Sequence, residues 1–435
     1  MELVASFGLL LQALAVEMTG ASFQSFRVII AGWVFAARRT VTGMIVAARA
    51  QASKHSSAFH RFFAQACWSL DGVGLRVFDL IEPWLPGTIL LGVDDTLARK
   101  RGLKVYGVGM HHDPLLSTRK TAVTNWGHSW VVLGVIVRFP FRADRYFCLP
   151  ILFRLYLNRK AAARAGGAGC TRPQLAVEML HRLCGHRKNR HFHLVADATY
   201  GGRSVLRHLP GNCDLTSRMH LEARLYQAPP PRRSGTRGRP RIRGQRLPTP
   251  RQWLEGPTRR LKLDLYGRRD RVRLADRQAR WHGAAYRPLR VVAVAPISGG
   301  RRPQAFYSTC HQATAEEVLD GYARRWSLEQ TFQEAKGHLG FQQPQGWTRR
   351  AVERTAPMAM LLYSLIVLWF AREGHRHYRP LNRPWYRTKT QPCFADMLAT
   401  LRRLSLQQQV FSWGLAGPGS QKILQTLENA ITQAA

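Results

Sequence analysis

Acidic side chains are scarce in this sequence. Only 26 of the 435 residues are Asp or Glu, against 65 Lys and Arg, so the formal net charge is +39. A protein this short of negative charge has a polyanion as its natural partner, and nucleic acid leads that class. Lysine is scarce too, because 55 of the 65 basic residues are Arg. A GC-rich coding sequence would produce the same excess of Arg, so the excess assigns no function by itself.

Paired cysteines and long apolar runs are also missing. The seven cysteines are dispersed and form no CxxC pair, which argues against a disulfide scaffold and for a reducing compartment such as the cytoplasm. The longest apolar run, 357–371, has 15 residues, fewer than the ~20 that a membrane-spanning helix needs. We expect a buried core helix there and no membrane partner. The length and the 45% hydrophobic content indicate a globular chain of two or three domains.

The first 80 residues have the pattern of helices. Apolar side chains recur at helical spacing, as in Phe59, Phe62 and Phe63, and basic patches lie between them. The sequence therefore predicts an N-terminal helical domain over 1–80. Two interpretations of it remain open: a helix-turn-helix-like unit that recognises DNA ends, and a helical cap on the following domain.

The period then changes to that of strands. Runs at 88–96, 104–113 and 129–139 predict three consecutive strands, and a helix follows at about 172–187. The next predicted strand, 192–202, is apolar up to Asp197. Acids thus stand near the ends of two strands: Asp94 and Asp95 on the first, and Asp197 on the last.

A long stretch separates Asp197 from the next informative segment. Glu329 follows 132 positions later, too far for a simple connection, so an inserted unit is expected. Strand-like runs at 218–226, 261–267, 271–275, 289–296 and 304–310 predict that the insertion is rich in β-structure. Residues 227–250 are rich in Arg, Pro and Gly and have too little apolar content to pack, which predicts a mobile basic loop.

The segment GYARRWSLEQTFQEAK carries the densest pattern of polar groups. Tyr322, Arg325, Glu329 and Lys336 fall within an arc of about 60° on one helix face. Glu334 lies about 140° from Glu329 on the same helix and is therefore the less suitable acid. Trp326 lies beside this stripe, and we expect it in the helix core.

Asp94 or Asp95, Asp197 and Glu329 form a set that the fold would have to bring together. Three carboxylates suit hard divalent cations, and two such ions stabilise the attacking and leaving oxygens of a phosphoryl transfer. Each acid taken alone is as well explained by a turn or by an ion pair with one of the many Arg residues. The set as a whole favours metal-assisted phosphodiester chemistry.

The motifs GVDDT, VADATYGG and YARRWSLEQTFQEAK together resemble the DDE-type insertion-sequence transposases that carry a tyrosine-arginine-glutamate-lysine signature. The resemblance implies an RNase H-like α/β domain over 81–203 and 316–375, with the N-terminal helical region, a β-rich insertion over 204–315 and a basic C-terminal extension over 376–435. It implies Mg²⁺ or Mn²⁺ as cofactor, two ions in all, double-stranded DNA as partner, and a homodimer on paired DNA ends.

The resemblance also assigns roles to single residues. Asp197 and Glu329 match the second and third catalytic acids and metal ligands. Arg325 and Lys336 match the basic members that hold DNA phosphates. Tyr322 belongs to the same signature and is expected to pack against a DNA base or sugar, with a place in the helix core as the alternative. The first acid is Asp94 or Asp95, because adjacent strand residues face opposite sides and both cannot serve. The pattern around Thr96 favours Asp94.

The Arg-rich loop adds a further set of candidate DNA contacts. The segment 236–244 resembles an AT-hook core, in which Arg side chains enter a narrow minor groove. The alternative is a generic phosphate-binding loop. In either case the side chains concerned are Arg237, Arg239 and Arg241.

The sequence therefore predicts a DNA transposase that cleaves element ends and joins them to a target. Two rivals remain: a metal-dependent nuclease of the same fold without strand transfer, and a non-catalytic DNA-binding derivative of a transposase.

Overall fold

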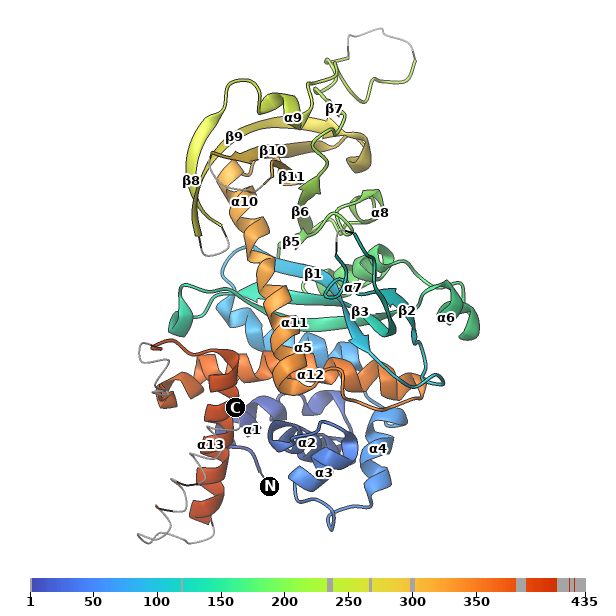
Figure 1. Cartoon of the computed structure of the whole chain (residues 1–435), viewed down its shortest axis with the longest axis vertical. Coiled ribbons are helices and arrows are strands. Elements are labelled where there is room, and N and C mark those ends of the chain that lie inside the picture. Colours follow the sequence, from blue (N-terminus) through green and yellow to red (C-terminus); the bar gives the residue numbers. More distant parts are fainter. Residues whose placement is uncertain are drawn as a thin grey trace.

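The structure is a computed structural model that describes residues 2–118, 120–232, 238–265, 268–297, 302–380 and 389–412, together with 422 and 426. A long mixed sheet runs through the molecule, with helices packed on its lower half in Figure 1. The sheet has the strand order β2-β3-β1-β5-β6-β11-β10-β9-β7, while β4 pairs with β3 and β8 with β9.

Five strands form the centre of this sheet. β1, β5 and β6 run parallel, β3 is antiparallel to β1, and β4 is antiparallel to β3. This mixed α/β arrangement confirms the predicted RNase H-like fold class. The five strands are β1 (Ile89–Arg99), β3 (Thr124–Val137), β4 (Phe147–Tyr156), β5 (Phe192–Ala196) and β6 (Cys213–Met219), and β2 (Gly109–His112) pairs with β3 at the edge.

β4 was not expected from the sequence. Its residues from Phe147 to Phe153 are all buried, so it lacks the alternation that marks a half-exposed strand. It also contains Pro150, which lies where the register with β3 shifts between Leu133 and Gly134.

Strands occur over the range 204–315 that was predicted as a β-rich insertion, but they do not form a separate sheet. β6 lies within the range predicted for the insertion, yet it is parallel to β5 and belongs to the central strands. β11 then pairs with β6, so the sheet continues directly into the insertion. The boundary at residue 204 therefore does not separate two sheets. The remaining strands are β7 (Leu225–Tyr226), β8 (Arg259–Leu265), β9 (Arg268–Trp281), β10 (Pro288–Pro296) and β11 (Gln304–Ser308).

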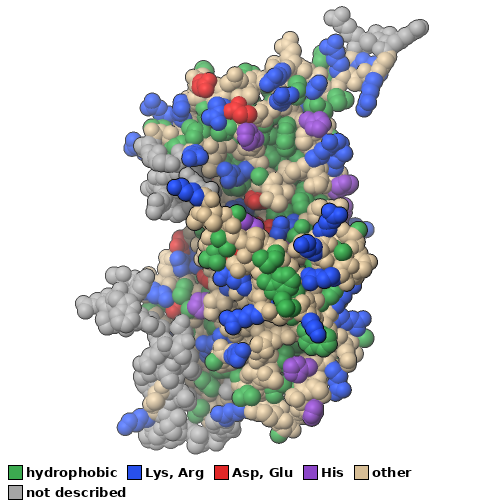
Figure 2. All heavy atoms as spheres, turned by 45° about the vertical axis from the view of Figure 1, so that its right-hand side comes forward, with side chains coloured by type: hydrophobic (Ala, Val, Ile, Leu, Met, Phe, Trp, Pro, Cys, Tyr) green, Lys and Arg blue, Asp and Glu red, His purple; other side chains and the backbone are tan. Residues whose placement is uncertain are grey.

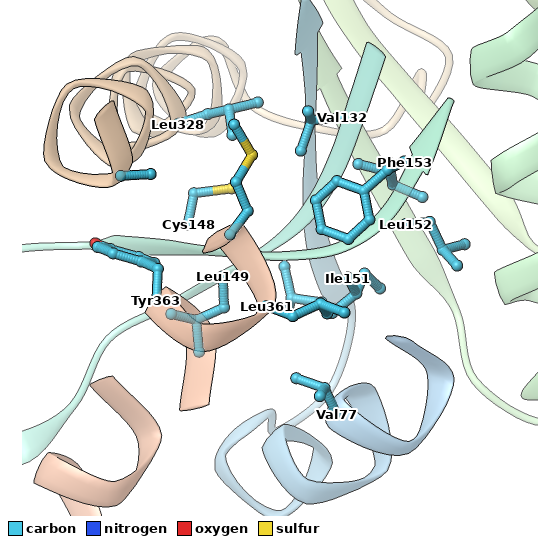
Figure 3. Close-up of a cluster of buried hydrophobic side chains, with 14 of the residues drawn as sticks. Val77, Val132, Cys148, Leu149, Ile151, Leu152, Phe153, Leu328, Leu361 and Tyr363 are labelled. Carbon is cyan, nitrogen blue, oxygen red and sulfur yellow. The ribbon is translucent and has the colours of Figure 1, made fainter. Parts of the chain in front are cut away.

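Helices from distant parts of the chain pack around β4. Leu328 comes from α11 (Trp326–Leu339), Leu361 and Tyr363 from α12 (Arg349–Arg372), and Val77 from α5 (Leu70–Ile81) (Figure 3). Two buried hydroxyls bond to the β4 backbone: Thr331 donates to the Cys148 carbonyl at 2.8 Å and Ser364 to the Pro150 carbonyl at 2.8 Å. These bonds fix α11 and α12 against the strand.

α12 confirms the predicted core helix and extends it toward the N-terminus. Its length and composition would suit a membrane span, but 94% of its most apolar window is buried inside the protein. The other helices are α1 (Ala5–Gln12), α2 (Gly20–Phe35), α3 (Val41–Ala47), α4 (Ser56–Ala64), α6 (Arg159–Arg164), α7 (Arg172–His186), α8 (Arg203–Leu206), α9 (Pro250–Trp253), α10 (Ala315–Arg324) and α13 (Phe394–Ser412).

The N-terminal helices share one hydrophobic core with the rest of the chain. Phe26 of α2 and Leu361 of α12 belong to the same buried cluster. Arg354 of α12 donates to the carbonyls of Phe63, Ala66 and Trp68, and so ties α12 to the end of α4. The region 1–80 is helical, and in packing it belongs to the same body as the rest of the chain.

Part of the C-terminal extension is packed as well. Phe394 and Leu401 of α13 are fully buried against the same core, so this stretch is not a loose tail. Beyond α13, only residues 422 and 426 of this extension are among the described residues.

We expect Phe26→Ala to destabilise the sheet together with the helices. Phe26 is fully buried, and such a truncation costs about 3 to 5 kcal/mol. Leu9→Ala is the control, since Leu9 is 74% exposed and should change stability by less than about 0.5 kcal/mol. Urea unfolding followed by far-UV circular dichroism and by Trp fluorescence should give coincident transitions that shift together. A separate early transition of the helical signal would contradict the shared core.

Candidate active site

The register of two parallel strands places Asp94 beside Asp197. Val93 of β1 is paired with Ala196 of β5, and the next residue on each strand is the acid. Residues paired across parallel strands point to the same face of a sheet. Two acids that are 103 positions apart in the sequence are thereby brought to one side of the sheet, where β5 ends.

The turn after β5 holds the Asp197 carboxylate. Its Oδ1 accepts from the backbone N–H groups of Thr199 at 2.9 Å and Tyr200 at 3.3 Å, and its Oδ2 accepts from the Thr199 hydroxyl at 3.2 Å. An Asp side chain that bonds the backbone two and three residues ahead stabilises such a turn. The same bonds fix the orientation of the carboxylate.

Asp94 is the most electrostatically perturbed acid of the group. Its pKa is raised to about 7, chiefly by burial and also by the charges of Asp197 and Asp95, while Arg325 opposes the rise. The backbone N–H of Asp95 also donates to Asp94 Oδ1 at 2.8 Å. A raised pKa from crowded carboxylates is a frequent mark of functional sites.

Arg325 connects Asp94 to the third acid. One guanidinium nitrogen lies 2.7 Å from Asp94 Oδ2 and the other 2.8 Å from Glu329 Oε1. Burial alone would lower the pKa of Arg325, but the carboxylates of Asp94 and Glu329 hold it above its ordinary value. Asp94 and Arg325 are mostly buried, with side chains 19% and 12% exposed, whereas Glu329 is 31% exposed. The group therefore opens to solvent on the Glu329 side.

The helix that carries this stripe is interrupted at Arg325. The sequence predicted one continuous helix, but α10 ends at Arg324 and α11 begins at Trp326. The Arg325 N–H bonds to the Tyr322 carbonyl, three residues back, at 3.2 Å. The interruption is slight, because Arg325 itself keeps right-handed helical dihedral angles.

Tyr322 and Trp326 lie on either side of this interruption. Tyr322 is 4% exposed and packs on Phe306 of β11, with ring centroids 4.7 Å apart. Its proposed contact with nucleic acid stays a prediction, and its observed place is the core beneath α10. The expectation that Trp326 is buried is wrong, because 44% of it is exposed.

Asp95 faces the opposite side of the sheet from Asp94. Its Oδ1 accepts from the Tyr200 hydroxyl at 2.9 Å, and its Oδ2 lies 3.2 Å from Arg172 Nε at the start of α7. The alternation of strand residues thus separates the two neighbouring acids. Asp94 lies with Asp197, Arg325 and Glu329, and Asp95 lies with Tyr200 and Arg172.

The sequence patterns did not identify Tyr200 and Arg172 as residues of the site. Tyr200 is fully buried and lies three residues after Asp197, so its bond to Asp95 ties the turn after β5 to β1. The signal for Tyr200 was present in the motif VADATYGG. Arg172 follows the helix cap at Thr171, and no local pattern marks it as a partner of Asp95.

Lys336 lies farther along α11. Burial lowers the pKa of its ammonium to about 8, with nearby Asp113 raising it and nearby Arg99 lowering it further. Within the described residues, it has no hydrogen bond or ion pair. A half-buried ammonium without a partner is suited to receive an anion. Glu334, by contrast, is paired with Arg145 at 3.1 Å and accepts from the Tyr363 hydroxyl at 2.9 Å, away from Glu329 as predicted.

The basic loop of the insertion is anchored at its base. Gln227 and Gln245 are bonded through their backbones, and Arg243 stacks on Tyr226 at 4.5 Å. Arg239 and Arg241 are exposed, and Arg237 lies outside the described residues. Their roles in DNA binding stay predictions.

The donor set at the acids suits a hard divalent cation. Carboxylate oxygens are the ligands that Mg²⁺ and Mn²⁺ prefer, and added positive charge would relieve the crowding that raises the pKa of Asp94. In the described part of the chain, no three His, Cys, Asp or Glu side chains already form a metal-binding group. Arg325 instead lies between Asp94 and Glu329.

We expect Asp94 to make the metal-free protein less stable as pH rises. Its folded-state pKa of about 7 exceeds the ordinary value of 3.8, so the native state binds more protons between these values and loses stability as pH increases. The full effect is on the order of 4 kcal/mol. Urea unfolding in EDTA should show the stability of Asp94→Asn gaining on the wild type between about pH 4 and pH 7. A stability difference that does not change with pH would contradict the raised pKa.

A comparison with protein-family models places the chain among known proteins, whereas no curated protein matches it. The family model of the DDE superfamily endonucleases matches residues 17–285. The match includes the strands that carry Asp94 and Asp197 and ends before Glu329, and it covers more than half of the chain. The chain therefore belongs to the DDE superfamily endonucleases, in agreement with the arrangement of its acids.

Proposed function

We propose that this protein is a DNA transposase that cleaves the ends of its element and joins the 3′ ends to target DNA. The observation that carries the proposal is the convergence of Asp94, Asp197 and Glu329, which come from two parallel strands and a distant helix. The family supports endonuclease activity, and the strand-joining step rests on the resemblance of the signature around Glu329.

The proposed chemistry consists of two phosphoryl transfers. In the first, water attacks a phosphorus atom at the element end, the P–O3′ bond breaks, and the released 3′ oxygen takes up a proton. In the second, this 3′ hydroxyl attacks a phosphorus of the target, loses its proton, and displaces a 3′ oxygen there. Divalent cations, two in the proposal, would supply activation of the nucleophile and stabilisation of the leaving oxygen.

The residues of the chain have separate parts in this proposal. Asp94, Asp197 and Glu329 would hold the cations. Arg325 keeps Asp94 and Glu329 oriented, and the unpaired Lys336 would bind a phosphate next to the scissile one. Asp95, through Tyr200, braces the turn that presents Asp197.

The charge of the surface supports a DNA substrate. Lys and Arg side chains spread over the face shown in Figure 2, where acidic ones are few. Such a surface attracts the phosphate backbone whatever its sequence, and the binding should weaken steeply with salt. A homodimer on paired ends, located with the DNA in a bacterial cytoplasm, belongs to the same proposal.

A nuclease without strand transfer is the second candidate. The family description, which names an endonuclease, favours it to the same extent as it favours the first step of transposition. Products in which element and target strands are joined would separate the two.

The first test is metal-dependent cleavage of a labelled duplex that carries the DNA flanking the element. We expect Glu329→Gln and Asp197→Asn each to reduce cleavage by at least about a thousandfold in Mg²⁺ or Mn²⁺, because the acids act as a unit. EDTA should abolish cleavage in the wild type. Glu334→Gln is the matched control on the same helix, and should leave cleavage within about tenfold of wild type if it still folds. Tight DNA binding without cleavage in any metal would favour a non-catalytic derivative.

A second test separates the neighbouring aspartates. Asp94→Asn should abolish cleavage, whereas Asp95→Asn should retain measurable activity, because it loses only the contacts to Tyr200 and Arg172. Both variants remove one negative charge from the same strand, so each is the control for the other. Thermal melts establish that both are folded. Activity retained by Asp94→Asn and lost in Asp95→Asn would reverse the assignment.

A further inference from the structure

A basic cleft lies beyond the acids, at the far end of β1. It has a volume of about 720 Å³ and forms where three segments meet: the residues after α2, the end of β1 with the loop after it, and the loop between α11 and α12. Its polar lining includes Arg38, Arg99, Lys100, Arg101, Gln342 and Gln345.

No acidic residue lines this cleft, although four basic residues do. The contrast is a second cleft of about 570 Å³ near the start of α12. There, Arg154 is paired with Asp71 and Glu178, and Arg349 with Glu353. The positive charges of the second cleft are therefore neutralised by acidic residues of its own lining, and those of the basic cleft are not.

The walls of the basic cleft are held in place by the protein itself. Lys100 Nζ donates to the carbonyls of Gln342 at 3.0 Å and Pro344 at 2.6 Å, which joins β1 to the loop after α11. Gln343 Oε1 accepts from the backbone N–H of Arg39 at 2.7 Å, which joins the same loop to the residues after α2. The shape is thus formed before any ligand arrives, which lowers the cost of binding.

Two of the cations remain available to a ligand. Arg99 is paired with Asp113 at 2.7 Å, and Lys100 is used by the carbonyls. Arg38 and Arg101 are exposed, and neither guanidinium has an ion pair or hydrogen bond to any described residue. A planar guanidinium binds phosphate oxygens in bidentate fashion, so the pair is suited to a phosphodiester backbone.

The cleft and the acids lie along the same two elements. Arg99 follows Asp94 by five residues on β1, about 17 Å at 3.3 Å per residue. On α11, Lys336 follows Glu329 by two turns, about 10 Å, and the charges of Arg99 and Asp113 act on it. Lys336 thus lies between the acids and the cleft. Basic side chains therefore continue from the acids to the cleft.

We propose that the cleft of Arg38 and Arg101 binds backbone phosphates of the cleaved DNA, about five nucleotides from the scissile phosphate. The figure of five follows from about 17 Å and the 3.4 Å rise per nucleotide of a DNA strand. This inference rests on the proposed function and adds a second anchoring point for the same substrate.

The test is DNA binding by the full chain as a function of salt, in EDTA so that no cleavage occurs. Arg38→Gln/Arg101→Gln should lower the slope of log affinity against log salt by about two, since each lost phosphate contact contributes about 0.9. Arg159→Gln/Lys160→Gln is the matched control. It removes two charges from exposed positions on α6, and should leave the slope unchanged. Arg38→Lys/Arg101→Lys should restore most of the slope.

Two outcomes would overturn the inference, and they differ in what they say of the proposed function. If the wild type binds and cleaves DNA but the double Gln variant keeps the wild-type slope, the cleft is not a phosphate site and the proposed function stands. If the wild type binds no DNA, both fail. The position of the site is tested with two duplexes, each shortened to about three base pairs on one side of the cut. The duplex that lacks the side near the cleft cannot reach it, so the wild type and the double variant should bind that duplex equally. A difference of the same size on both shortened duplexes would overturn the placement.

Discussion

The ion pairs of Arg325 are the interaction on which the site depends. Asp94 lies in a mostly buried position next to Asp197 and Asp95, where carboxylates repel one another and water screens little. The guanidinium between Asp94 and Glu329 offsets this repulsion and at the same time fixes α11 against β1. Leaving either acid buried without this partner would cost several kcal/mol. The break between α10 and α11 belongs to the same arrangement, because Arg325 occupies the junction.

Sequence patterns predicted the residues of the site better than the elements that surround it. Alternation along a strand was enough to show that Asp94 and Asp95 face opposite ways, and helical spacing was enough to separate Glu329 from Glu334. The rule of parallel pairing, however, required knowing that β1 and β5 are neighbours. That neighbour relation comes from tertiary packing, and no local pattern near Asp94 or Asp197 contains it. Which of the two aspartates is catalytic stays a prediction.

The errors have identifiable physical causes. The sequence of β4 lacks the alternation of apolar and polar residues because both faces of the strand are covered. Its apolar run therefore did not match the pattern of a half-exposed strand. Trp326 was expected in the core because it lies beside the polar stripe of the helix, but helical spacing does not show whether another element covers that side. The N-terminal helices and α13 were predicted as separate parts. The apolar face of an amphipathic helix indicates that the helix packs, but it does not indicate which element covers that face. In each case the missing information was the partner surface.

The shared core of the N-terminal helices has a consequence for synthesis on the ribosome. The apolar faces of α2 and α4 are covered by α12 and α13, which are encoded roughly 300 residues later. At about 5 to 20 residues per second, these faces wait roughly 15 to 60 s for their cover. A shorter delay of the same kind applies to β1, which pairs with β5 only after some hundred further residues. The nascent chain is therefore a long-lived substrate for chaperones, and a ribosome that stalls before α12 releases a chain with exposed apolar helices rather than a folded DNA-binding fragment.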